Sequence, residues 1–195
     1  MHPEYFAIAV GPLIVLVFVF FARRGMGRAK IQSPRLGFLN LKGAAGEQTL
    51  AEDRSAFASM FNTTLESATQ PPPCDVLFIY CDIERDGRIS GTTAGVRDLI
   101  RDSGARVAVV ASENPSECLI ASGKKTGYGH ANLVLTLERR GAVFPAFFSR
   151  LFVEMMNGTP MPLAWVKLAP QIPGHDHADC PGTIFAAEAG QIAFK

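Results

Sequence analysis

The sequence predicts an α/β fold in which a mostly parallel, doubly wound sheet is flanked by helices and is preceded by one N-terminal transmembrane helix. Three observations predict this fold. Short apolar runs recur along the chain, and stretches with the apolar spacing of helices separate them. The apolar runs are nearly continuous, which is typical of parallel strands covered on both faces. One longer uncharged run stands at the N-terminus, ahead of all the others.

The strands are predicted from apolar runs that are bounded by turn residues. Four of them cover residues 36–41, 75–81, 106–111 and 132–137. The last part of the chain, residues 183–194, is expected to form a terminal hairpin with its turn at Ala189 and Gly190.

The helices are predicted from apolar residues that repeat every three or four positions. They cover residues 47–65, 93–103 and 144–156. Gly104 is expected to end the second helix. Residues 163–169 fit either a strand or a short helix, and the polar residues 82–92 and 112–129 are expected to be loops. Because strands alternate with helices, the connections between parallel strands should be right-handed crossovers.

Residues 5–22 are predicted to span a membrane. These eighteen residues carry no charge, and at about 1.5 Å per residue they make roughly 27 Å of helix, close to the ~30 Å hydrocarbon core of a bilayer. Two other interpretations fit less well. A secretory signal peptide carries positive charge before its apolar run and small residues at its cleavage site, whereas Glu4 precedes this run and Phe20 and Phe21 stand near its end. A buried helix of a soluble domain would usually show a polar face.

Basic residues directly after this run predict its orientation. Arg23, Arg24, Arg28 and Lys30 follow it, and such clusters stay on the cytoplasmic side, where they contact lipid headgroups. The chain is therefore expected to be single-pass in the inner cell membrane, with its C-terminal domain in the cytoplasm. The predicted parts are a short outer N-terminus at residues 1–4, the span at 5–22, a juxtamembrane linker at 23–34 and an α/β domain at 35–195.

Composition limits the partners. The whole chain carries a net charge of +1 and residues 1–30 carry +3, so the remaining 165 residues carry −2. A domain near neutrality argues against nucleic acid as the main partner. The four cysteines form no Cys-x-x-Cys pair, and in a cytoplasmic domain they are expected to be free thiols.

The loop before the terminal hairpin gathers candidate metal ligands. His175, His177 and Cys180 fall within six residues, and imidazole and thiolate are common ligands of zinc-like ions. No metal-binding spacing accompanies them, and Pro-Gly pairs bracket the loop. A solvated loop without cofactor and a zinc-like site both remain open. Residues 82–89 begin like a calcium loop but lack its last glutamate, so a polar turn is expected there.

Polar residues also follow the ends of two buried strands, where ligands bind in open α/β sheets. Cys81 and Asp82 end one of these strands, and Ser112 follows the next. Cys118 lies farther along the same loop, and His130 lies just before the third strand. A Cys or Ser nucleophile needs a base within hydrogen-bond reach, and Cys118 with His130 is the pair that chain order suggests. Each of these residues fits an ordinary loop position equally well.

One further pattern lies in the order of the elements. A strand is followed by a helix that carries Ala51-Glu52-Asp53, then by an apolar strand, the turn at residues 84–91 and a second helix. A second apolar strand ends at Ala111, and a later strand and helix lead to Asn157-Gly158 and to Pro162-Leu163-Ala164. Over residues 35–170 this layout resembles the caspase-like clan of cysteine peptidases, which includes the bacterial CHAT domains.

The resemblance implies a caspase-like layout without its catalytic dyad. The family's His follows the first apolar strand, where this chain has Cys81 and Asp82. The family's Cys follows the second, where this chain has Ser112 or Glu113. A carboxylate does not position a thiol as an imidazole does, and a serine without a base is a poor nucleophile. The resemblance therefore implies a pseudo-enzyme.

Three functions follow from these observations. The leading hypothesis is a membrane-anchored interaction or signalling module without catalysis, which binds another protein or a second copy of itself; the resemblance adds a bacterial defence or stress system. The second is a membrane-tethered hydrolase that uses Cys118 or Cys81 with His130, or a metal at residues 175–180. The third is a sensor of a small anion or nucleotide, with Lys124, Lys125 and backbone amides meeting phosphate.

Overall fold

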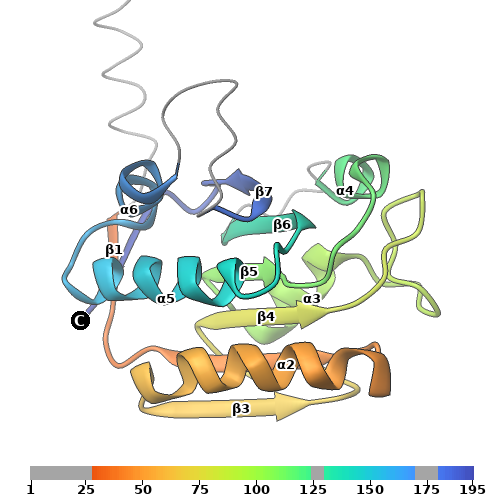
Figure 1. Ribbon diagram of the computed structural model, residues 1–195, viewed down its shortest axis with the longest axis horizontal. Helices are drawn as coiled ribbons and strands as arrows, with labels where there is room; N and C mark the ends of the chain where they lie inside the picture. The colour runs from red at the N-terminus through yellow and green to blue at the C-terminus, as the bar shows by residue number, and fades with distance from the viewer. Residues whose placement is uncertain (1–27, 124–129, 170–179) are drawn as a thin grey trace, which may run out of the picture.

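The computed structural model describes residues 28–123, 130–169 and 180–195. A six-stranded sheet with the order β3-β2-β4-β5-β6-β7 forms its middle layer, and helices cover both faces (Figure 1). The strands are β2 (Arg35–Asn40), β3 (Thr63–Ser67), β4 (Val76–Tyr80), β5 (Val107–Val110), β6 (Asn132–Glu138) and β7 (Gly182–Ala186). Strands β2 to β6 pair in parallel, and β7 runs antiparallel to β6. The predicted α/β class with a mostly parallel sheet is confirmed.

Side chains that alternate along the strands divide the core between two layers of helices. The helices are α2 (Ala44–Phe57), the 3-10 turn η1 (Ala58–Met60), α3 (Val96–Ser103), α4 (Ser116–Gly123), α5 (Val143–Met156) and α6 (Met161–Leu168). Phe78 and Tyr80 of β4 face α2, α5 and α6, whereas Leu77 and Ile79 face α3 and α4. Successive strand residues point to opposite faces, so a fully apolar strand buries both of its sides.

Aromatic rings fill the layer between the sheet and α5. Phe78 lies in the middle, and its ring centroid is 5.0 Å from that of Phe57 and 5.6 Å from that of Phe148. Phe148 and Phe152 come from the apolar stripe of α5, which repeats at three and four residues. Edge-to-face and tilted ring pairs of this kind add to the stabilisation that burial of their area provides.

A second, two-stranded sheet joins the two ends of the described chain. Strand β1 (Arg28–Ile31) pairs in parallel with β8 (Gln191–Phe194), and Ile192 and Phe194 of β8 are buried in the core. Strand β1 lies in the segment expected to be a juxtamembrane linker. Basic and apolar residues alternate in β1, but only over four positions, which is too short a run to have been taken as a strand in the linker interpretation.

Most predicted elements occur where the apolar patterns indicated. The four predicted inner strands match β2, β4, β5 and β6 to within one residue at each end. Helices α3 and α5 are also confirmed, and Gly104 ends α3 in the left-handed conformation, with φ 72°. Residues 163–169, left open between strand and helix, form most of α6.

Three predictions were wrong. The helix expected over residues 47–65 ends at Phe57, because the chain turns through η1 and then pairs as edge strand β3 with β2. The polar loop expected over residues 112–129 contains helix α4, which packs Cys118 and Leu119 against the sheet. The terminal hairpin does not form, since β7 pairs with β6 and β8 pairs with β1.

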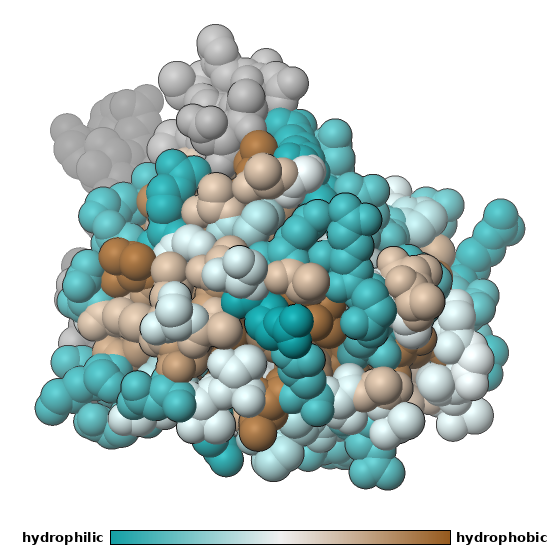
Figure 2. All heavy atoms as spheres, turned by 60° about the horizontal axis from the view of Figure 1, so that its bottom comes forward, coloured by the Kyte–Doolittle hydropathy of each residue, from teal (hydrophilic) through white to brown (hydrophobic). Residues whose placement is uncertain are grey.

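The edge formed by β3 is polar. Its residues Thr63, Glu66 and their neighbours are exposed or half-buried, and Arg54 of α2 forms an ion pair with Glu66 at 2.9 Å. Figure 2, in which the bottom of Figure 1 is turned forward, shows apolar residues interspersed with polar ones. Charged side chains on an edge strand oppose pairing with other chains.

No helix within residues 28–123, 130–169 and 180–195 is long and apolar enough to cross a membrane. The predicted span at residues 5–22 lies outside the described residues.

Candidate functional site

The strand order creates a crevice at one edge of the sheet. Strands β3 and β4 lie on opposite sides of β2, so the connections that leave β2 and β4 diverge at their carboxyl ends. Ligands bind at such switch points in open α/β sheets. A hollow of about 520 Å³ lies at this edge. It is lined by Lys42, Ala45, Gly46, Gln48, Thr49, Glu52, Tyr80, Ser112, Glu113, Arg139 and Gly141. We call it the carboxyl-edge crevice.

A buried ion pair lies under the crevice. Asp53 of α2 is fully buried, and its oxygens accept hydrogen bonds from Arg139 Nη2 at 2.9 Å and Nη1 at 3.1 Å. Tyr80 Oη donates to the same carboxylate at 2.8 Å. Arg139 Nη1 also donates to the Ala111 carbonyl at 2.9 Å, and its guanidinium lies 3.9 Å from the Phe144 ring centroid. These contacts join α2, β4 and α5 to the residues that directly follow β5 and β6.

Burial dominates the electrostatics of this pair. It raises the pKa of Asp53 above the ordinary 3.8, although the hydrogen bonds and charge of Arg139 act in the opposite direction. Burial and the neighbouring Asp53 carboxylate raise the pKa of Tyr80 well above 10.0, so the phenol stays protonated and donates. Arg139 satisfies the carboxylate with two parallel bonds, the geometry in which a buried charge is tolerated.

A second set of hydrogen bonds fixes the loops that follow β4 and β5. Ser112 Oγ accepts from the Cys81 amide at 2.7 Å and donates to the Cys81 carbonyl at 2.8 Å. Asn114 Oδ1 accepts from the Ile83 amide at 2.8 Å, and Asn114 Nδ2 donates to the Cys81 carbonyl at 3.2 Å. The two strand ends singled out in the sequence are therefore adjacent, and the Ser112 hydroxyl is engaged with backbone.

The rim of the crevice is more acidic than basic. Lys42 forms an ion pair with Asp82 at 2.6 Å, and Arg139 is paired with Asp53. Among the described residues, Glu52 and Glu113 form no ion pair, and Glu113 accepts a hydrogen bond from the Arg139 amide at 2.7 Å. Both side chains are exposed. The charge left over at the rim is negative, which favours a basic group in the crevice.

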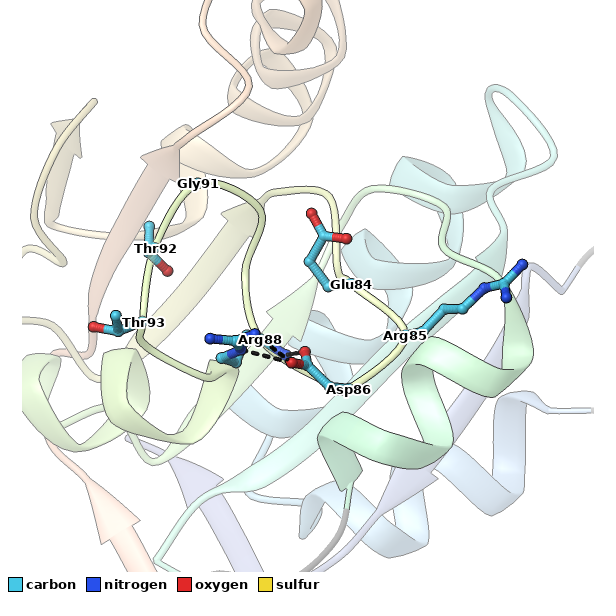
Figure 3. A pocket seen from close by; sticks show the side chains of 7 residues that line it. All are labelled: Glu84, Arg85, Asp86, Arg88, Gly91, Thr92 and Thr93. Atoms are coloured by element: carbon cyan, nitrogen blue, oxygen red, sulfur yellow. Dashed lines mark hydrogen bonds and ion pairs between the residues drawn. The ribbon is translucent and has the colours of Figure 1, made fainter.

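An open hollow of about 730 Å³ lies beside the loop between β4 and α3 (Figure 3). The carboxylates that line it bind to other side chains of the same loop. Asp86 and Arg88 point toward one another and form an ion pair at 2.6 Å, and Glu84 accepts from Ser90 Oγ at 2.6 Å. Hydrogen bonds to Arg88 keep the pKa of Asp86 below its ordinary value. A calcium loop requires acidic residues that converge on one point, and the acidic residues of this turn do not converge.

The candidate thiols lie in apolar surroundings. Cys81 is 1% exposed, and burial raises its pKa to about 12. Cys118 lies on the buried side of α4 in the cluster between the helix and the sheet. His130 is exposed at the start of β6, at the opposite edge of the sheet from Cys81 and Ser112. Thiolates are the nucleophilic form of cysteine, so this burial works against catalysis.

The candidate metal loop lies largely beyond what the structure covers. His175 and His177 are outside the described residues, and Cys180 is half-buried. Within the described part of the chain, no group of three or more His, Cys, Asp or Glu side chains converges as metal ligands would.

The buried pair of Asp53 and Arg139 was not predicted from the sequence. Asp53 and Arg139 are 86 positions apart, and nothing in the sequence near either residue indicates that they pair. The available signal for Asp53 was its spacing from Leu50 and Phe57, which places all three on the buried side of α2.

Comparison of the chain with protein-family models, with curated proteins and with solved structures found no match.

Proposed function

We propose that this chain is a single-pass, membrane-anchored α/β interaction or signalling module, a catalytically degenerate caspase-like domain that binds a partner protein in its carboxyl-edge crevice. One observation supports the proposal: the loops after β4 and β5, where the resemblance would place the dyad, are adjacent, and the side chains of Asp82 and Ser112 there are held in other contacts. Asp82 is paired with Lys42, and Ser112 is bonded to the Cys81 backbone.

The crevice itself supports a binding role. It lies at the switch point of the sheet, its floor is held by the Asp53–Arg139 pair, and Glu52 and Glu113 give its rim negative charge. A preorganised polar surface whose carboxylates form no ion pair within the described part of the chain suits a basic segment of a partner. The hydrolase alternative has less support, because the Cys81 and Cys118 thiols are buried.

The binding role is tested with the full chain in lipid nanodiscs probed against an array of random peptides. Bound peptides should be enriched in Lys and Arg, and the double variant Glu52→Gln with Glu113→Gln should lose most of this binding, because the rim charge is removed while the acceptor for the Arg139 amide remains. Asp102→Asn is the matched control, since Asp102 is an exposed carboxylate on α3. An array without bound peptides, or equal loss in the control, would contradict the proposal.

The membrane anchor is tested by fractionation. Full-length chain expressed in bacteria should pellet with membranes and resist carbonate extraction, whereas a variant without residues 5–22 should move to the supernatant. Recovery of the full-length chain in a detergent-free supernatant would overturn the anchor.

A further inference from the structure

Helix α6 presents two large apolar side chains to solvent on one face. Leu163 and Val166 are each 56% exposed, and their spacing of three residues places them on the same side of the helix. The opposite side faces the core, where Met161 and Ala164 are fully buried. The helix therefore has apolar side chains on its outward side as well as on its inward side, whereas a surface helix usually has polar side chains outward.

This helix lies beside the point where the described chain begins. The Asn132 amide group contacts Met161 Sδ at 3.7 Å and donates to the Gly190 carbonyl at 3.0 Å. Gly190 directly precedes Gln191, and Gln191 pairs with Arg28, the first residue of β1. The first turn of α6 and the start of β1 are thus neighbours (Figure 1).

The chain that leads into β1 is short. The uncharged run at residues 5–22 ends six residues before Arg28, and six extended residues reach at most about 20 Å. A bilayer that holds the run therefore lies close to the start of β1 and to α6. Lys30 of β1 is exposed, and it continues the basic cluster that begins at Arg23.

We propose that the outward face of α6 rests on the bilayer that anchors the chain, with Leu163 and Val166 in the headgroup region and Lys30 of β1 facing anionic lipids. The inference rests on the proposed function, because it requires the anchor. Apolar side chains flanked by basic ones are the features by which short amphipathic segments bind a membrane surface. The tether supplies the proximity that two side chains alone would not.

This contact also orients the domain. Asn132 and Gly190 lie at the amino end of β6, whereas the carboxyl-edge crevice lies at the other end of the strands. With α6 on the lipid, the crevice remains open to partners in the aqueous phase.

The contact is tested by fluorescence of the full chain in vesicles of phosphatidylcholine and phosphatidylglycerol. The Cys180→Ser background leaves only the buried Cys74, Cys81 and Cys118, and Leu163→Cys then carries a polarity-sensitive fluorophore. Its emission should shift to shorter wavelength and be quenched by brominated lipids. The control is Ile120→Cys on α4, a helix of the same length whose Ile120 is 63% exposed; a fluorophore there should report water.

Carbonate extraction of the same vesicles separates the two proposals. If the chain is integrated but the probe at position 163 reports water, the α6 contact is overturned and the anchor stands. If the probe is shielded from water without lipid quenching, a second copy or another protein covers the face and the lipid contact is overturned. If the probe at position 120 responds equally, the contact is not a property of α6. If the chain is extracted, both proposals fail.

Discussion

The Asp53 carboxylate has no exposed surface, and the positive charge of Arg139 offsets the free-energy cost of burying it in the core. Arg139→Met should destabilise the chain by about 3–5 kcal/mol at neutral pH, because it leaves a buried charge without its partner. Urea denaturation of the two proteins measures the difference. Arg54→Gln, which breaks the exposed pair with Glu66, is the control and should cost no more than about 1 kcal/mol.

The same variant should depend on pH in a defined direction. Burial already raises the pKa of Asp53 above 3.8, and loss of Arg139 raises the folded-state pKa further. A raised carboxyl pKa favours the folded state below the unfolded pKa, and this benefit is lost as pH rises through the folded pKa. The cost of Arg139→Met should therefore be smaller near about pH 4 than at neutral pH. An equal cost at both pH values would contradict the charge argument.

The cysteines differ in their exposure to solvent, and the more exposed thiol should react faster. Burial raises the pKa of Cys74 and Cys81 to about 12, and Cys118 is also buried. Cys180 is half-buried. Alkylation of the native chain with iodoacetamide, read by peptide mass spectrometry, should label Cys180 first. Rapid labelling of Cys81 or Cys118 would instead favour the hydrolase hypothesis.

At the level of elements, the loop between β4 and α3 is held against α4. Gly87 has φ 89°, and a Cβ there would lie 2.7 Å from the Ala121 carbonyl carbon and from the Ser122 amide nitrogen. Gly87→Ala should therefore separate the loop from α4 and destabilise the chain by more than the ~1–2 kcal/mol that left-handed backbone alone costs. Hydrogen exchange of the α4 amides should rise.

Gly91 in the same loop provides the matched control. Its φ is 75°, but a Cβ there would meet no atom within 4 Å. Gly91→Ala should cost only about 1–2 kcal/mol of backbone strain and leave α4 protected. Equal exchange in the two variants would mean that the close approach at Gly87 has no role.

The inner strands and α5 were predictable because their burial pattern is local: β4 and β5 are apolar on both faces, and α5 repeats at helical spacing. Strand β3 was not, since Thr63–Ser67 is polar and acquires its conformation by pairing with β2. The terminal hairpin was also predicted wrongly because the pairing partners lie far away in the sequence. The turn at Gly190 is present, but the Asn132 side chain forms hydrogen bonds with Ala189 and Gly190, and β8 pairs with β1.

At the scale of the whole molecule, the position of the candidate site could be predicted from the sequence, but the charged residues that form it could not. Cys81 and Ser112 follow buried parallel strands, so their meeting at the carboxyl edge follows from the fold class. The pairing of Asp53 with Arg139 depends on where packing places α2 relative to the residue that follows β6, and no periodicity in either segment encodes that distance. Sequence patterns therefore indicate which edge of the sheet carries the site, and packing decides which charges it holds.

Strand β8 buries side chains in the core, and its contribution to the stability of the fold can be measured at one residue. Phe194 is 1% exposed, and its ring centroid lies 6.1 Å from that of Phe61 and 6.3 Å from that of Phe152. Phe194→Ala should therefore cost about 3–5 kcal/mol, as for other fully buried aromatic residues. Ile184→Ala, on the exposed side of β7, is the control and should cost about 1 kcal/mol or less.

This variant also tests whether the domain unfolds as one unit. The core cluster between the sheet and helices α2, α5 and α6 contains residues as far apart in the chain as Leu36 and Phe194, and Trp165 of α6 packs against it. Loss of the Phe194 ring should therefore shift the Trp165 fluorescence transition and the far-ultraviolet circular dichroism transition together, because a single cooperative core has coincident transitions. A fluorescence transition that moved alone would mean that β1, β8 and α6 form a separate unit, so that an anchor at the N-terminus would hold that unit rather than the crevice.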